Sequence, residues 1–328
     1  MRRLSLNFLL AIGLLAVAAV AVALGEVQLS PGQYAEAFGS PGSPAAQILW
    51  EVRAPRVLTA ALVGACLGLS GALLQGLLRN PLADPGVLGV SACAGLGAAL
   101  AIVAGLAVTP GAVELAALTG AGFAAALLVG FAARFAEPEA LILFGVSLSA
   151  FAGALTALVF NFSPSPIATA EVLAWLLGSV ENRSWSDVAW GAGALAVGAG
   201  LGAWARRGLL ALTLGEETAS TTGLPMRRLK IAAILAAAIA TGAAVALAGV
   251  VGFVGLAAPH LVRAAVREDP ARLLLPSALA GALMLMAADL LARMLPTDAE
   301  VKLGVMTALV GAPLFGLIAW RAARSWRT

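Results

Sequence analysis

The chain has 328 residues, of which 61% are hydrophobic and only 11% are charged. Its mean hydropathy of +0.97 and its low charge content lie far from soluble proteins, in which about 25% of residues are charged. This composition excludes a soluble globular protein and predicts an integral membrane protein with no nucleic-acid partner. The net charge of +3 matters chiefly through where the basic residues fall along the chain.

Apolar runs dominate the chain from end to end. Crossing a hydrocarbon core of about 30 Å takes roughly 20 helical residues. A tenth segment, 255–266, is too short to cross alone and contains Pro259, so it predicts a half-length helix among protein neighbours. We therefore predict an all-α, polytopic membrane protein with about ten transmembrane helices, one of them short, in a single domain over residues 1–328. The nine long runs are 4–24, 57–78, 87–108, 113–135, 141–162, 188–205, 229–251, 273–295 and 301–320.

The first apolar run has two interpretations. Two arginines, an apolar run and small residues near Ala23 are also typical of a secretory signal peptide. The run is about twenty residues, however, and signal cores are usually about 7–15. We expect a retained first span.

Basic residues are distributed unevenly over the two faces that ten spans create. Fifteen of the 20 lysines and arginines fall on the face that holds the termini. The positive-inside rule then places both termini in the cytoplasm, and the protein in the inner (cytoplasmic) membrane. The five basic residues expected on the outer face are Arg53, Arg56, Arg183, Arg293 and Lys302.

Several kinds of chemistry have no basis in the sequence. The only lysines, Lys230 and Lys302, do not follow glycine, so the chain has no phosphate-binding loop for ATP hydrolysis. His260 is the sole histidine and has no cluster of metal-ligating neighbours, which favours a packing role. Cys66 and Cys93 lie in apolar spans and are expected to be free, buried thiols. We expect no enzyme activity, no cofactor and no metal site.

Asp289 is the best candidate for ion coupling, because charges inside a span are costly and usually functional. Arg293 lies one turn further on, as an i,i+4 partner. A structural ion pair is the favoured interpretation. An ion-coupled secondary transporter remains the alternative function.

Glycines are grouped in three places. Gly64, Gly68 and Gly71 put small residues along the second span. The glycines within 198–202 do the same in the sixth span, as in closely packed membrane helices. The series Gly249, Gly252 and Gly255 ahead of Pro259 instead predicts an irregular segment lined by protein.

The polar interruptions together resemble the permease family of ABC importers for iron–siderophores, haem and cobalamin. The motifs R-x-P-R, G-x-x-L-x-x-S-G-x-x-x-Q and N-P-L-A-x-P-x-x-L-G-V begin here at Arg53, Gly64 and Asn80. The later blocks GFVGLAAPHLVR, AADLLAR and GVMTALVGAPLF follow in order at 252–263, 287–293 and 304–315. The resemblance thus covers essentially the whole chain.

This resemblance implies a transport subunit that works as a homodimer. Its partners would be two cytoplasmic ATPase subunits and an external substrate-binding protein. The cargo would be an iron chelate, haem or cobalamin, with iron chelates favoured because they dominate the family.

The resemblance also implies an ATPase-coupling segment at about 214–228. Locally, Glu216 and Glu217 favour a helix N-terminus, and Gly223 with Pro225 would stop that helix. The family commonly has Ala-Arg-x-Leu-Gly where this chain has residues 219–223, so the docking contacts differ; the other interpretation is a solvated loop. The coupling residues are Glu216, Glu217, Ala219, Gly223, Leu224 and Pro225.

Two further sites are implied. Arg53, Arg56 and Arg293 would receive carboxylates of the binding protein, unless they anchor lipid head groups or pair internally with Asp289. The cytoplasmic gate would be formed by two loops, one between spans two and three and one between spans four and five, which we name the first and second gate loops. Leu82 would form the constriction, because an apolar ring can exclude water from a pore. The gate residues are Asn80, Pro81 and Leu82 in the first loop and Pro138 and Glu139 in the second.

Overall fold

The computed structural model describes residues 2–25, 27–135, 137–295 and 300–325, which fold into helices without strands. A helix lies in every one of the ten predicted segments, which confirms the all-α polytopic fold. Seven are long and apolar enough to cross a membrane, and the apolar parts of α5, α12 and α14 are shorter. The ten are α1 (Arg2–Ala23), α4 (Ala54–Leu78), α5 (Val90–Val103), α6 (Ala112–Ala132), α7 (Pro138–Asn161), α9 (Trp185–Leu212), α11 (Met226–Ala248), α12 (Val254–Arg263), α13 (Pro270–Met294) and α14 (Leu303–Ser325).

Shorter elements connect these helices, and most of them were not predicted. α8 (Pro166–Leu176) follows a Ser165 cap whose hydroxyl accepts a hydrogen bond from the Ile167 N–H, with proline in the first turn. α2 (Pro31–Gly39) begins at a capping box of Ser30 and Gln33. The others are α3 (Pro44–Gln47), the π-helical turn η1 (Ile48–Arg53), the 3-10 turns η2 (Leu106–Val108) and η3 (Ala264–Val266), and α10 (Glu216–Thr221).

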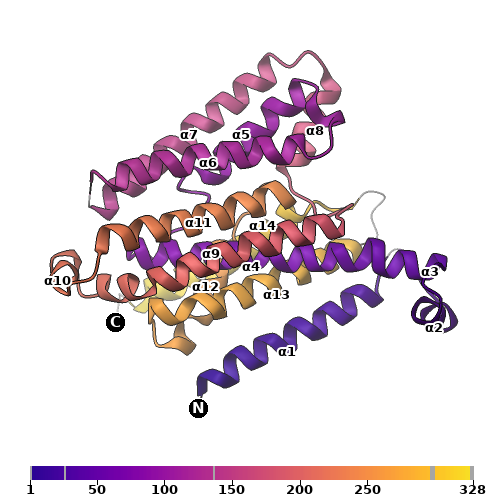
Figure 1. The fold of residues 1–328 in the computed structure, drawn as a ribbon, viewed down its shortest axis with the longest axis horizontal. Helices are drawn as coiled ribbons and strands as arrows, with labels where there is room; N and C mark the ends of the chain where they lie inside the picture. Colours follow the sequence, from indigo (N-terminus) through magenta and orange to yellow (C-terminus); the bar gives the residue numbers. More distant parts are fainter. Residues whose placement is uncertain (1, 26, 136, 296–299, 326–328) are drawn as a thin grey trace.

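The helices form layers around α4 and α11 (Figure 1). In the apolar windows of both helices 83% of residues are buried, against 11% in α7. α5 to α8 lie together on one side of this centre, and α1 lies on the other against α13. α10 marks one end of the long axis and α2 the opposite end (Figure 1). We refer to these as the α10 end and the α2 end.

Glycines set the close approach of α4 to its neighbours. A Cβ at Gly64 would lie 2.2 Å from the carbonyl oxygen of Gly281, and one at Gly71 would lie 1.8 Å from that of Gly255. Neither distance is possible for real atoms, so the predicted small-residue face of the second span is confirmed. A Cβ at Gly200 would meet no atom of the described residues within 4 Å. Close packing of the sixth span therefore does not extend to this glycine.

The chain between α11 and α12 is irregular, as the glycine series predicted. Gly249 ends α11 at φ 70° and Phe253 precedes α12 at φ 68°. The backbone here is held by protein: the Ser179 N–H donates to the Ala248 carbonyl at 2.9 Å. A Cβ at Gly249 would lie 2.2 Å from the Trp175 carbonyl oxygen. The irregular backbone is therefore packed against protein at these points.

Candidate functional site

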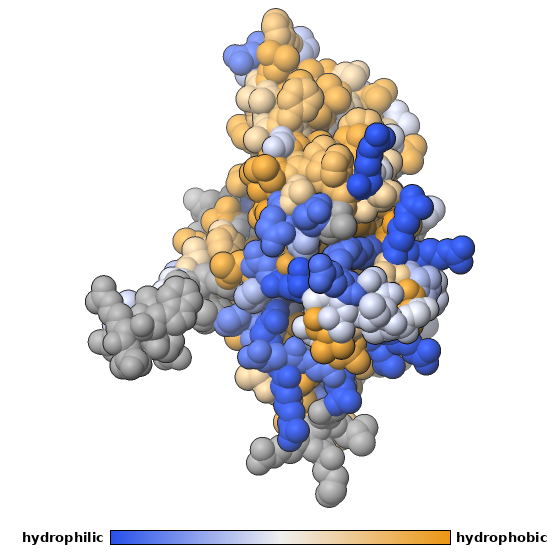
Figure 2. Space-filling model, turned by 90° about the vertical axis from the view of Figure 1, so that its left-hand side faces the viewer, coloured by the Kyte–Doolittle hydropathy of each residue, from blue (hydrophilic) through white to orange (hydrophobic). Residues whose placement is uncertain are grey.

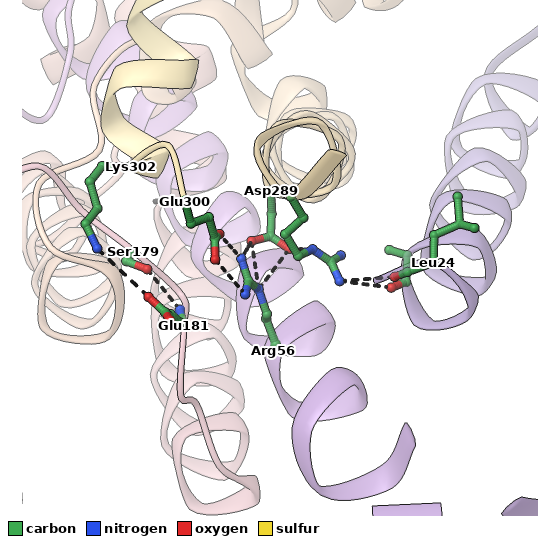
Figure 3. Close-up of polar contacts among 9 residues, drawn as sticks. Leu24, Arg56, Ser179, Glu181, Asp289, Glu300 and Lys302 are labelled. Atoms are coloured by element: carbon green, nitrogen blue, oxygen red, sulfur yellow. Dashed lines mark hydrogen bonds and ion pairs between the residues drawn. The ribbon is translucent and has the colours of Figure 1, made fainter. Parts of the chain in front are cut away.

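Four charged side chains from three segments meet at the α2 end, and we name Arg56, Asp289, Arg293 and Glu300 the arginine–carboxylate cluster. Arg56, on the first turn of α4, donates to Asp289 Oδ1 from Nη2 at 2.8 Å and from Nε at 3.0 Å. The same guanidinium donates from Nη1 to Glu300 Oε2 at 3.1 Å and pairs a second time through Nη2. Figure 3 shows Arg56 between the two carboxylates. One arginine therefore bridges α13 and the segment that leads into α14.

Arg293 completes the cluster from the last turn of α13. Its Nε lies 3.1 Å from Asp289 Oδ2, and its Nη1 donates to the carbonyl of Ala21 at 3.2 Å. The side chains of Asp289 and Arg293 are 3% and 4% exposed. Buried charges require such pairing, because an isolated ion in a low-dielectric interior is very costly. The ion pair of Asp289 with Arg293 was the favoured expectation.

Arg53 is buried beside the cluster without touching it. Its guanidinium donates to the carbonyls of Val22 and Ala23 at 3.0 and 2.7 Å and also to that of Val27. Val22 and Ala23 are the last two residues of α1 and Val27 lies just beyond it, so Arg53 caps the C-terminal end of that helix. All three arginines predicted to dock the binding protein thus already have partners within the chain, as the alternative for Arg56 and Arg293 foresaw. Their docking role stays a prediction.

The first gate loop follows α4 at the α10 end. Arg79 takes a left-handed conformation at φ 49°, which ends the helix. The Asn80 side chain then accepts a hydrogen bond from the Leu82 N–H at 2.9 Å, forming a local turn. Pro81 is exposed and Leu82 is 63% exposed at the tip. An apolar side chain held on a short, hydrogen-bonded turn suits a constriction on a pore axis.

Residues outside the gate motif hold this loop in place. Gln75 Nε2 donates to the Ala83 carbonyl at 3.3 Å, and Arg263 of α12 donates to the Gln75 Oε1. Ser149 of α7 donates to the carbonyls at the end of the loop, at 3.1 and 3.0 Å. The loop is therefore tied to α4, α7 and α12. Gln75 and Arg263 belonged to motifs noticed in the sequence, whereas Ser149 carried no signal.

Asp84 lies in the same loop against the first turn of α12. Its Oδ1 accepts a hydrogen bond from the Gly86 N–H at 2.8 Å, and its Oδ2 would be 3.1 Å from a Cβ at Gly255. Burial raises the pKa of the Asp84 carboxyl, and the Gly86 N–H offsets part of that rise. Its hydrogen bond to Gly86, two residues on, is that of a turn.

The predicted coupling segment forms a short helix. α10 begins with Glu216 and Glu217 in its first turn and ends at Thr221, before Gly223 at φ 73°. Ala219 is buried, whereas most of the other side chains of the segment are exposed. The local prediction of a helix stopped by glycine is confirmed, and the role of this segment in ATPase coupling stays a prediction.

Lys230 on α11 pairs with this helix beside the second gate loop. It pairs with Glu216, and its side chain is 14% exposed. Glu216, Lys230 and Pro138 line the same small hollow, together with the end of α4. Pro138 is the first residue of α7, and Glu139 beside it is exposed. The structure thus places the predicted coupling helix and the second gate loop around one hollow, a proximity that no sequence motif signalled.

An apolar hollow of about 530 Å³ lies between α8, the irregular 249–253 segment and α14. Backbone hydrogen bonds close one side of it, because the N–H groups of Leu303 and Gly304 donate to the carbonyls of Gly178 and Leu177. The start of α14 is therefore fixed both to α8 and, through Glu300, to the arginine–carboxylate cluster.

A bundle of apolar helices with an irregular segment between α11 and α12 defines a polytopic membrane protein. The model of the FecCD transport family matches residues 12–321. The vitamin B12 import permease BtuC of Vibrio cholerae is 41% identical over 311 residues, covering 93% of this chain and 91% of that protein. The ABC transporter permease YvrB of Bacillus subtilis, described as uncharacterized, is 38% identical over 297 residues, or 89% and 84% of the two chains.

A solved structure described as an inward-facing, metal-chelate type ABC transporter matches with a TM-score of 0.86 and 32% identity. It covers 97% of this chain and 99% of that one. The chain belongs to the FecCD transport family and is a permease of the ABC importer type.

Proposed function

We propose that this permease carries a metal chelate of the cobalamin class inward across the inner membrane, as a homodimer with two ATPase subunits and an external binding protein. The names of its relatives support a chelate, since two of them are cobalamin permeases and the matching structure is of metal-chelate type. Ferric siderophores, favoured from family prevalence, and haem are the competing cargoes. The α10 end would face the cytoplasm with both termini.

One observation carries the proposal: α10 is paired with α11 through Lys230, and both helices line one hollow with the second gate loop. The Glu216–Lys230 pair anchors the coupling helix on α11, and the hollow beside it is lined by Pro138 at the start of α7. Motion of an ATPase subunit against α10 would therefore move the start of α7. Because Ser149 of α7 bonds to the end of the first gate loop, the same motion reaches Leu82.

The uncovered layer of the fold supports assembly with a second copy. Large apolar side chains on α7 are open, with Leu143 69% and Phe151 63% exposed. In a two-fold assembly around this layer, the gate loops of both subunits would approach the axis, and substrate would pass between them.

Docking of a binding protein would occur at the α2 end. Arg56 already holds Asp289 and Glu300, so an incoming carboxylate would have to replace one of them. Glu300 is the more replaceable, because its side chain is 14% exposed and that of Asp289 is 3% exposed. Docking would then loosen the start of α14.

The alternative, an ion-coupled transporter, would use Asp289. Its carboxylate is engaged by two arginines, which favours a structural role. Uptake into proteoliposomes distinguishes the two functions. We expect labelled cobalamin to enter only with ATP, the ATPase and the binding protein, and to be unaffected by an uncoupler.

The same assay tests the cargo by competition with a ferric siderophore and with haem. Competition by cobalamin alone would support the proposed class. Uptake that an uncoupler abolishes, without need of ATP, would contradict the importer mechanism.

A further inference from the structure

Four arginines at the α10 end are exposed and have no ion-pair partner among the described residues. Arg206 and Arg207 lie near the end of α9, and Arg227 and Arg228 lie in the first turn of α11. Buried or paired arginines hold helices together, as those of the arginine–carboxylate cluster do at the other end. Among the described residues none of these four has an ion-pair or hydrogen-bond partner, and we name them the double-arginine patch.

The fold brings the two pairs together. α9 and α11 pack closely, and a Cβ at Gly208 would lie 2.8 Å from the Cβ of Leu229. Gly208 follows Arg207 directly, and Leu229 follows Arg228 directly. The parts of α9 and α11 that carry the two arginine pairs are therefore adjacent.

The charge around the patch is positive. Residues 204–230 contain five basic and two acidic residues, a net charge of +3. One of the acids, Glu216, is already paired with Lys230. Figure 2 shows hydrophilic residues gathered over this end of the molecule, below a broad apolar surface. The patch therefore favours an anionic partner.

The outer face of α9 indicates where that partner lies. Trp190, Val197 and Trp204 recur every seven residues and are 76%, 53% and 51% exposed, which makes a continuous apolar stripe. Arg207 lies one turn beyond Trp204, on the same side of the helix. Tryptophan is enriched at the level of lipid head groups, where its ring is apolar and its N–H is polar. The stripe runs along hydrocarbon, and the arginines lie at head-group depth.

We propose that the double-arginine patch binds the phosphate of an anionic phospholipid in the leaflet at the α10 end, with the acyl chains along the α9 stripe. Guanidinium groups pair with phosphate oxygens through two parallel hydrogen bonds. Basic pockets between helices on the cytoplasmic side of membrane proteins bind anionic lipids in this way. The inference concerns the permease alone and does not depend on what it carries.

Native mass spectrometry of the purified permease tests this. Phosphatidylglycerol should be retained in preference to phosphatidylcholine, and R206Q/R207Q or R227Q/R228Q should weaken retention by about tenfold. R206K/R207K should retain most of it, which separates charge from folding. R134Q/R267Q is the matched control, because both arginines are exposed and without an ion pair, and it should change little.

Excess glycerol phosphate or inorganic phosphate should not displace the lipid, because neither supplies acyl chains. Equal retention of both lipids, or retention unchanged in the glutamine variants, overturns the proposal. If the variants keep the lipid preference but no longer bind the ATPase subunit, the patch is a protein-docking surface and the lipid assignment is wrong.

Discussion

The two ends of the bundle use positive charge in opposite ways. At the α2 end, Arg53, Arg56 and Arg293 turn inward and bind carboxylates and helix-end carbonyls. At the α10 end, the double-arginine patch is exposed and unpaired, and Leu82 points an apolar side chain outward. Inward charges fix the positions of helices, whereas outward charges leave a surface for another molecule.

The two lysines of the chain, one at each end, differ in how buried and how closely paired they are. Lys230 at the α10 end is 14% exposed and joins a coupling helix to α11. Lys302 at the other end is 32% exposed and lies 3.9 Å from Glu181, at the limit of an ion pair. They provide a matched pair of substitutions for comparing the ends.

The largest expected effect is on the stability of the α2 end. Asp289→Ala leaves Arg56 and Arg293 buried with one carboxylate fewer, so we expect a loss of about 3–5 kcal/mol in unfolding free energy. Thermal unfolding in detergent measures it. Glu114→Gln is the control, because its pair with Arg183 is partly exposed and should contribute less than about 1 kcal/mol. Equal losses would mean that the arginine–carboxylate cluster does not hold the helices together.

The next effect separates coupling from stability at the α10 end. Lys230→Met removes the ion pair to Glu216, and we expect transport per ATP to fall by roughly fivefold, the size of a 1 kcal/mol coupling change. ATP hydrolysis and assembly with the ATPase should persist, and Lys230→Arg should restore most of the coupling. Lys302→Met should leave the ratio unchanged. A normal ratio in Lys230→Met would show that α10 acts on the gate by another route.

Most of the fold could be predicted because membrane helices are recognisable from the length of their apolar runs. The broken segment also followed from local chemistry, since Gly249 ends α11 at a positive φ that glycine adopts readily, whereas Pro259 lies inside α12. The coupling helix was foreseen for the same reason, from its acidic start and its glycine stop. The free, buried thiols of Cys66 and Cys93 are likewise confirmed.

The partners of the site residues could not be predicted, because they depend on contacts distant in sequence. Arg56 meets Asp289 across 233 positions and Glu300 across 244; the pair with Asp289 was foreseen only as an alternative, and no pattern in the chain selects Glu300. Ser149 resembles any small polar residue of an apolar helix until α7 is packed against the gate loop. α8 escaped notice because its 11 residues are too few for a span.

A smaller effect is expected at the gate. Leu82→Ala shortens an exposed apolar tip, so passive leak of substrate from loaded proteoliposomes should rise if that tip excludes water from the pore. Stability should be unchanged, because the side chain is 63% exposed. Leu115→Ala on α6, at a site 66% exposed, is the control for loss of an open leucine. Leak at the wild-type level would remove Leu82 from the gate.

The smallest expected effect distinguishes the two uses of Arg56. A charge reversal at Arg56 would place a carboxylate against Asp289 and Glu300, and the resulting instability would hide any docking role. Glu300→Gln instead removes a competitor and leaves Asp289 as the internal partner. If the binding protein docks a carboxylate on Arg56, its affinity should rise by about two- to fivefold, with a steeper dependence on salt.

Surface plasmon resonance on the reconstituted permease measures this rise, and Glu181→Gln, which removes a carboxylate beside Lys302, is the control. An affinity unchanged by Glu300→Gln would mean that Arg56 binds only carboxylates of its own chain, and that the α2 end recognises its partner through other residues.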